Sequence, residues 1–82
     1  MKVYGHHISN EDIDLVFTHV TSQTNFTARQ VVNRLAIQGV HRDARYRAAD
    51  RAIQKWKKEG KIFYDKGNQC WRDIKYYDAI YG

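Results

Sequence analysis

The sequence predicts a small α+β domain in which three helices precede a C-terminal β-hairpin. Three observations support this fold: three segments carry apolar residues at helical spacing, two of them end in glycine, and two short apolar runs flank a turn. The chain has 82 residues, which suffices for one domain with one core. We expect a single domain over residues 1–82, with the core in about residues 9–72 and an aromatic tail over 73–82.

The first helix is expected near residues 10–21. Ser9 is a favourable N-cap, and an acidic residue follows three positions later, much as in a capping box. Acidic side chains in the first turns also suit the positive end of the helix dipole. The apolar stripe of this segment consists of Ile13, Val16, Phe17 and Val20.

The second helix is expected near residues 27–38. Thr27 and Gln30 have the spacing of a capping box, and Phe26 and Val31 have that of a hydrophobic staple. Gly39 supplies the helix stop. Phe26 and its neighbours are also compatible with a short strand before this helix.

The third helix is expected from about Asp43 to Glu59, with Gly60 as its C-terminal stop. The tight connector 39–42 joins it to the second helix, as in a helix-turn-helix. Its inward stripe consists of Ala49, Ala52, Ile53 and Trp56. We expect one shared core that contains Trp56, Ile53, Leu35, Val32, Phe17 and Ile62.

The hairpin is expected over residues 61–72. Residues 61–64 and 69–72 are the strand candidates, and the turn-rich tetrad 65–68 connects them. The tail that follows is rich in tyrosine and isoleucine, and its pattern leaves open whether it covers its own domain or contacts a partner.

Three helices followed by a hairpin resemble the winged helix-turn-helix family. The stretch from Phe26 to Arg72 carries the resemblance, and its most telling part is AIQKWKKEGKI at residues 52–62. There the third helix ends in a Glu-Gly turn that an aliphatic strand residue follows, and Trp71 supplies an aromatic on the return strand. The resemblance implies a non-catalytic, sequence-specific protein for double-stranded DNA, such as a small bacterial or phage transcriptional regulator. The same fold also serves as a protein-interaction module.

The distribution of charge favours nucleic acid as the partner. The chain carries 14 basic and 9 acidic residues, a net charge of +5. Residues 1–40 and 67–82 are each neutral, so the whole excess lies in residues 41–66, with nine basic and four acidic groups. A localised basic surface attracts polyanions. The alternative interpretation is that these charges only form an ordinary hydrated helix surface. Asp43 and Asp50 favour this alternative, because their carboxylates would repel phosphate.

Seven residues are the expected DNA contacts: Arg42, Arg47, Arg51, Gln54, Lys55, Lys58 and Lys66. Helix 43–59 would enter the major groove, where Arg and Gln can read bases and Lys holds phosphate. Ala44 and Ala48 lie near this outward stripe and are small enough to let a groove wall approach. Lys66 would reach the DNA backbone from the tip of the hairpin.

Two other partners stay open at this point. The tail carries Ile74, Tyr76, Tyr77, Ile80 and Tyr81, and tyrosine-rich surfaces are typical of protein interfaces. A homodimer or another protein contact through residues 73–82 is therefore the main alternative. RNA is a further candidate, because the same basic face could bind it.

Enzymatic, metal-dependent and membrane roles are not expected. Cys70 is the sole cysteine and has no visible histidine and acid to orient it as a nucleophile. His6, His7, His19 and His41 fall at no recognised metal spacing, so we expect surface histidines and no metal or cofactor. The first residues lack the apolar run of a signal peptide and no segment is apolar enough to span a bilayer, which predicts a cytoplasmic protein.

Overall fold

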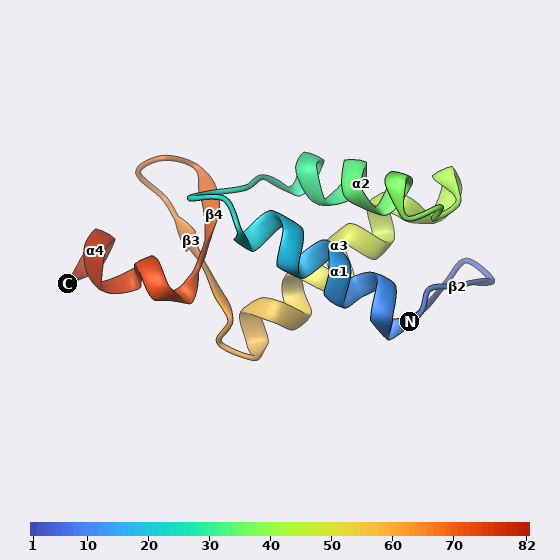
Figure 1. The fold of residues 1–82 in the computed structure, drawn as a ribbon, viewed down its shortest axis with the longest axis horizontal. Helices are drawn as coiled ribbons and strands as arrows, with labels where there is room; N and C mark the ends of the chain where they lie inside the picture. Colours follow the sequence, from blue (N-terminus) through green and yellow to red (C-terminus); the bar gives the residue numbers. More distant parts are fainter.

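The chain forms four α-helices and two small antiparallel hairpins in a computed structural model that describes all 82 residues (Figure 1). The elements are β1 (Lys2–Val3), β2 (His6–His7), α1 (Asn10–Thr21), α2 (Ala28–Ile37), α3 (Arg42–Lys58), β3 (Ile62–Asp65), β4 (Cys70–Asp73), a 3-10 turn (Ile74–Tyr76) and α4 (Tyr77–Tyr81). The three expected helices and the expected hairpin are thus confirmed to within two residues. This α+β arrangement is compatible with a winged helix.

α1 and α2 begin at the N-cap residues that the sequence predicts, and side-chain hydrogen bonds cap both helices. The Ser9 hydroxyl accepts the Asp12 N–H at 3.1 Å. Thr27 and Gln30 form the complete capping box, with bonds of 2.9 and 3.3 Å between side chain and backbone. Gly39 and Gly60 end α2 and α3 with φ of +85° and +74°, values that glycine adopts without a steric penalty.

The N-terminal end of α3 has an unusual cap. His41 Nδ1 accepts the N–H of Asp43 at 3.1 Å, so the helix begins one residue earlier than expected, at Arg42. An imidazole nitrogen here takes the role that a serine or aspartate oxygen usually has.

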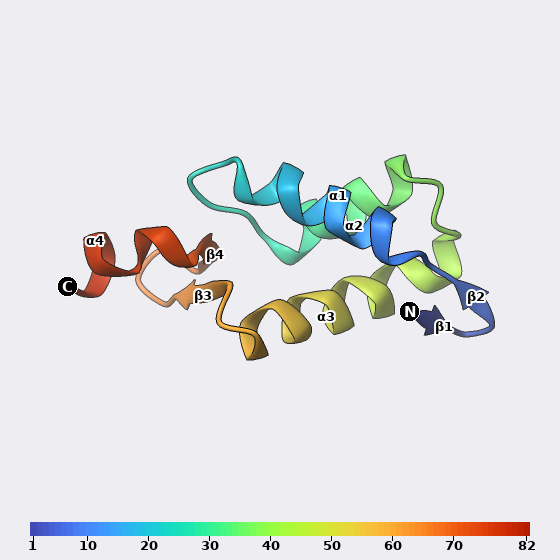
Figure 2. The same ribbon diagram turned by 60° about the horizontal axis from the view of Figure 1, so that its bottom comes forward.

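The core lies between α1, α2 and α3 and extends to β1 and β3. Trp56, Ile53, Leu35, Val32 and Ile62 are all buried in one cluster of 17 residues. Phe17 is half-buried at its edge and meets the Trp56 ring edge-on, with centroids 5.1 Å apart. The expected shared core is therefore confirmed, with Phe17 at its margin. Figure 2 shows α3 running beneath α1 and α2, from the β1–β2 hairpin to the β3–β4 hairpin.

The β3–β4 hairpin, called the wing below, is joined to the helical body through Phe26. Ile62 pairs with Asp73 at one end of the wing and Asp65 with Cys70 at the other. Phe26 and Trp71 exchange two backbone hydrogen bonds of 2.8 and 2.9 Å. The segment before α2 thus adds a bridge to the wing, in line with the short strand that its sequence allows.

A buried ion pair fixes the outer part of the wing. The Asp65 carboxylate is 2% exposed and accepts from Arg72 Nε at 2.8 Å and from Asn68 Nδ2 at 2.8 Å. Arg72 also donates to the Thr24 carbonyl at 2.8 Å, which ties the wing to the loop after α1. The hydrogen bonds from Asn68 and Arg72 lower the pKa of Asp65 from 3.8 to about 2.

An N-terminal hairpin, which the sequence did not predict, covers one flank of α3. β1 and β2 pair around Tyr4 and Gly5, both at positive φ, and Val3 and Ile8 are buried in the core. Strands of two residues are too short to show an apolar alternation, which explains why the pattern did not reveal them.

The expected exposure of Ala44 and Ala48 is wrong. Both are fully buried, as members of the same cluster as Val3. The N-terminal hairpin contacts this flank of α3 and occupies the space that a DNA groove wall was expected to approach. The small side chains of the two alanines therefore serve internal packing.

The tail packs on the wing and stays partly exposed. The Phe63 ring meets Tyr77 and Tyr81 edge-on at 5.2 and 5.8 Å. The Tyr81 hydroxyl donates to the Tyr64 carbonyl at 3.3 Å. α4 lies at the end of the 42 Å long axis opposite to the N-terminal hairpin (Figure 1). None of the helices has the length and apolar character of a bilayer span.

A first prediction concerns the capping box. Thr27→Ala removes the hydroxyl that accepts the Gln30 N–H and should lower the free energy of unfolding by about 1 kcal/mol. In a domain of this size, that loss corresponds to a fall in Tm of about 4–8 °C. Thr18→Ala is the matched control, because Thr18 lies inside α1 and only bonds back to the Asp14 carbonyl. Equal Tm values for Thr27→Ala and the parent in a thermal melt would refute the cap.

A second prediction concerns acid stability. A carboxylate whose pKa is lower in the folded than in the unfolded chain adds stability above the unfolded value of 3.8, and this stability is lost as the pH falls to about 2. Asp65→Asn should lower Tm at neutral pH and make the stability fall less steeply between these pH values. Asp14→Asn is the matched control, because it makes the same substitution at an exposed carboxylate of α1 and leaves the Asp65–Arg72 pair intact. It should lower Tm at neutral pH much less than Asp65→Asn. Parallel pH profiles for Asp65→Asn and the parent would contradict the assignment.

Candidate nucleic-acid interface

One edge of α3 carries a continuous line of basic side chains. Arg47, Arg51, Lys55 and Lys58 follow one another at spacings of four, four and three residues, and all four are exposed. Residues at these spacings lie on one face of a helix. We call these four residues the basic stripe. It runs along the side of α3 that borders the N-terminal hairpin.

The two arginines of the basic stripe already have partners within the protein. Arg47 Nη1 lies 3.5 Å from the Asp50 carboxylate, an exposed i,i+3 ion pair. Arg51 Nη1 donates to the Lys2 carbonyl at 2.9 Å, which links α3 to β1. No hydrogen bond or ion pair engages the ammonium groups of Lys55 and Lys58. The lysines are thus free to meet an anion, whereas the arginines would exchange one partner for another.

Gln54 and the acidic residues occupy the rest of the exposed face of α3. Asp43 and Asp50 are exposed there, as the hydrated-surface interpretation expects. Gln54 is exposed and borders a hollow of ≈ 420 Å³ between α2 and α3. The side chains that line it are mainly apolar and include Val32, Tyr46, Ile53 and Trp71. Gln54 therefore lies next to an apolar groove.

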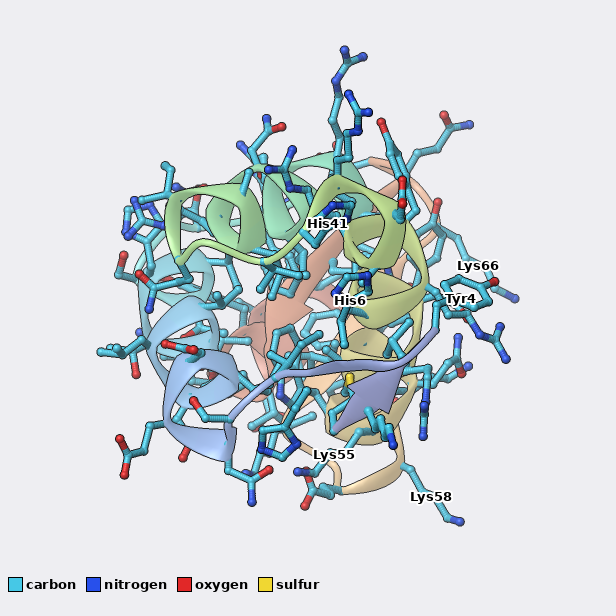
Figure 3. All side chains as sticks on the ribbon, turned by 90° about the vertical axis from the view of Figure 1, so that its right-hand side faces the viewer. Tyr4, His6, His41, Lys55, Lys58 and Lys66 are labelled. Carbon is cyan, nitrogen blue, oxygen red and sulfur yellow. The ribbon has the colours of Figure 1, made fainter.

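The remaining expected contacts, Arg42 and Lys66, lie outside the basic stripe. Arg42 is exposed in the first turn of α3. Lys66 is exposed in the loop between β3 and β4, whose Asn68 is held by Asp65. Figure 3 shows Lys66 projecting to the right near mid-height, Lys58 projecting to the lower right, and Lys55 between Lys58 and the centre of the view, below the N-terminal hairpin. Lys66 of the wing and Lys58 of the stripe thus both lie toward the right of this view, at different heights.

The exposed cations include some that the expected set omits. Lys57 is exposed near the end of α3, and Lys61 follows it before the wing, 3.7 Å from Glu59. Arg45 is half-buried instead and donates to the Val40 carbonyl at 2.8 Å, so it braces the turn before α3. The excess of positive charge in residues 41–66 was a signal for Lys57 and Lys61. Helical spacing alone could not show that these lysines are exposed whereas Arg45 is half-buried.

Three potential metal ligands come together at the start of α3. The rings of His6 and His41 stack with centroids 4.5 Å apart, and the Asp43 carboxylate lies 3.6 Å from His41 Nδ1. Sequence spacing did not reveal this cluster, since His6 and His41 are 35 positions apart and meet only through the N-terminal hairpin. Only the fold creates the proximity.

Comparisons of this chain with protein-family models, with curated proteins and with solved structures found no match. The residues of the chain itself are therefore the basis for inferring its function.

Proposed function

We propose that this protein is a non-catalytic winged helix-turn-helix protein that binds double-stranded DNA with sequence specificity. Its role would be that of a small transcriptional regulator acting in the cytoplasm. The observation that carries the proposal is the basic stripe: four exposed cations in line on α3, within the only segment of the chain that holds excess positive charge.

The arrangement of helices supports a groove-binding role for α3. The tight turn at Gly39 joins α2 to α3, and both pack on the core around Trp56. A helix held in this way presents its outer surface rigidly, which is what insertion into a major groove requires. The wing adds the exposed Lys66, which is available to meet the flanking phosphates.

The partners of the arginines assign different roles along the basic stripe. Arg47 shares its charge with Asp50, so its attraction to DNA is reduced. Arg51 gives up a neutral carbonyl partner when it turns to a base, and a guanine offers two acceptors in exchange. Arg51 is therefore the main base-reading residue in this proposal, and Lys58 and Lys66 hold phosphates.

The alternative is a protein-interaction module that uses the tail, for example to form a homodimer. Its support is the exposure of apolar side chains after the wing: Ile74 is 44% exposed, Tyr77 46% and Tyr81 52%. Exposed aromatic surface of this kind is enriched in protein interfaces. A domain of this kind would bind DNA weakly or not at all.

A third prediction tests the electrostatic part of the DNA proposal. The protein should shift any duplex at low salt, and its affinity should fall steeply with added salt because neutralised phosphates release counterions. If each of the four cations of the basic stripe neutralises one phosphate, the affinity should fall by about 100-fold between about 50 and 200 mM monovalent salt. Fluorescence anisotropy with a labelled duplex measures both quantities. A response that does not change with salt would favour the tail-based alternative.

A fourth prediction separates base reading from phosphate binding. Arg51→Ala should cost about 1–3 kcal/mol on a selected site and far less on scrambled duplex. Lys58→Ala and Lys66→Ala should weaken both duplexes equally, and each should lower the salt slope by about 1. The measurement is a titration of each variant on both duplexes at two salt concentrations.

The matched control for this series is Lys75→Ala, which removes an exposed cation from the tail, outside the basic segment. It should bind like the parent. Thermal melts identify any variant that loses affinity by unfolding. If Arg51→Ala loses no more on the selected site than on the scrambled one, its base-reading role is wrong. If all variants bind like the parent and deletion of residues 74–82 abolishes self-association, the alternative is correct.

A further inference from the structure

The cluster at the start of α3 joins two segments that are distant in sequence. His6 comes from β2, His41 caps α3, and Asp43 belongs to the first turn of α3. The two imidazole rings lie nearly parallel, with an interplanar angle of 10°. One ligand atom from each of the three residues falls within 4.8 Å of the other two. Figure 3 shows His6 and His41 next to each other near the centre of the view.

The shortest of these distances, between His41 and Asp43, is close to that between two ligands of one metal ion. Zn²⁺ binds imidazole nitrogen and carboxylate oxygen at about 2.0–2.2 Å, so two tetrahedral ligands lie about 3.3–3.5 Å apart. His41 Nδ1 and Asp43 Oδ2 are 3.6 Å apart, so one ion can bind both with little movement. The His6 and His41 rings are stacked, so the His6 ring has to rotate before its nitrogen and that of His41 point to one ion.

The surroundings leave room for further ligands. A hollow of ≈ 180 Å³ adjoins the cluster and is lined by His6, His41, Asp12 and the turn at Gly39. A water molecule can occupy the fourth position from this side. Two imidazoles and one carboxylate select Zn²⁺, Ni²⁺ or Cu²⁺ over Mg²⁺ and Ca²⁺, which prefer oxygen ligands.

We propose that His6, His41 and Asp43 form a binding site for a divalent transition-metal ion of the Zn²⁺ class. The ion would clamp the N-terminal hairpin to the first turn of α3. Binding through His41 Nδ1 replaces the bond that this nitrogen accepts from the Asp43 N–H, so the metal takes over from the histidine cap. The Asp43 carboxylate offsets the unfavourable placement of a cation at the positive end of the helix dipole.

This inference does not depend on the proposed DNA binding, because the site and its test involve the free protein only. A fifth prediction follows for the full chain titrated with zinc chloride alone by isothermal calorimetry, in a buffer that does not chelate zinc. One Zn²⁺ should bind per chain, and Tm should rise with zinc. His6→Ala and His41→Ser should each weaken zinc binding by about 10-fold or more, because each loses a ligand.

The variants are chosen so that loss of folding and loss of metal binding are distinguishable. Serine is a favourable N-cap, so His41→Ser keeps α3 capped while it removes the imidazole. His19→Ala is the matched control, since His19 is exposed at the end of α1 and lies outside the cluster. It should bind zinc like the parent. Absence of zinc binding by the parent, or an equal loss in His19→Ala, would overturn the proposal, as would equal affinity for Mg²⁺.

Discussion

The structure depends on the burial of one face of α3 around Trp56. Six residues of this helix are buried, from Ala44 in its first turn to Trp56 in its last, and through them α3 contacts α2, β1 and β3. Removal of this apolar surface from water stabilises the domain and sets the rotation of the helix about its axis. The basic stripe is exposed as a consequence, because its residues lie outside the buried face. The same helix thus supplies both the centre of the core and the proposed contact surface.

The elements around α3 divide its exposed surface into different environments. The N-terminal hairpin borders the basic stripe and accepts a hydrogen bond from Arg51, whereas Gln54 faces the apolar hollow toward α2. The wing is held by the buried Asp65–Arg72 pair and by the Phe26–Trp71 bridge, so the position of Lys66 relative to α3 depends on its neighbour Asp65 and on the contact of the wing with the helical body. Breaking a buried pair of this kind leaves an unpaired charge and is costly. Positioning of the proposed contacts is therefore a property of the whole fold.

Much of the fold could be predicted because its signals are local. The capping box at Thr27, the glycine at position 39 and the spacing of Ile53 and Trp56 each act within a few residues. The N-terminal hairpin, the burial of Ala44 and the meeting of His6 with His41 could not be predicted in this way, because they depend on contacts between distant segments. For the site, all seven expected contacts are exposed, although the exposed Lys57 and Lys61 were not among them. It could not reveal the partners that Arg47 and Arg51 find within the protein.

We propose that the basic stripe and the wing contact the same DNA duplex. NMR of the ¹⁵N-labelled chain, titrated with duplex DNA at low salt, tests this claim most directly, because each amide reports on its own surroundings. We expect the largest shift changes at Arg47, Arg51 and Lys58 and in the wing loop around Lys66, with residues 74–82 unaffected. Changes confined to residues 74–82, or no changes at any DNA concentration, would contradict the account.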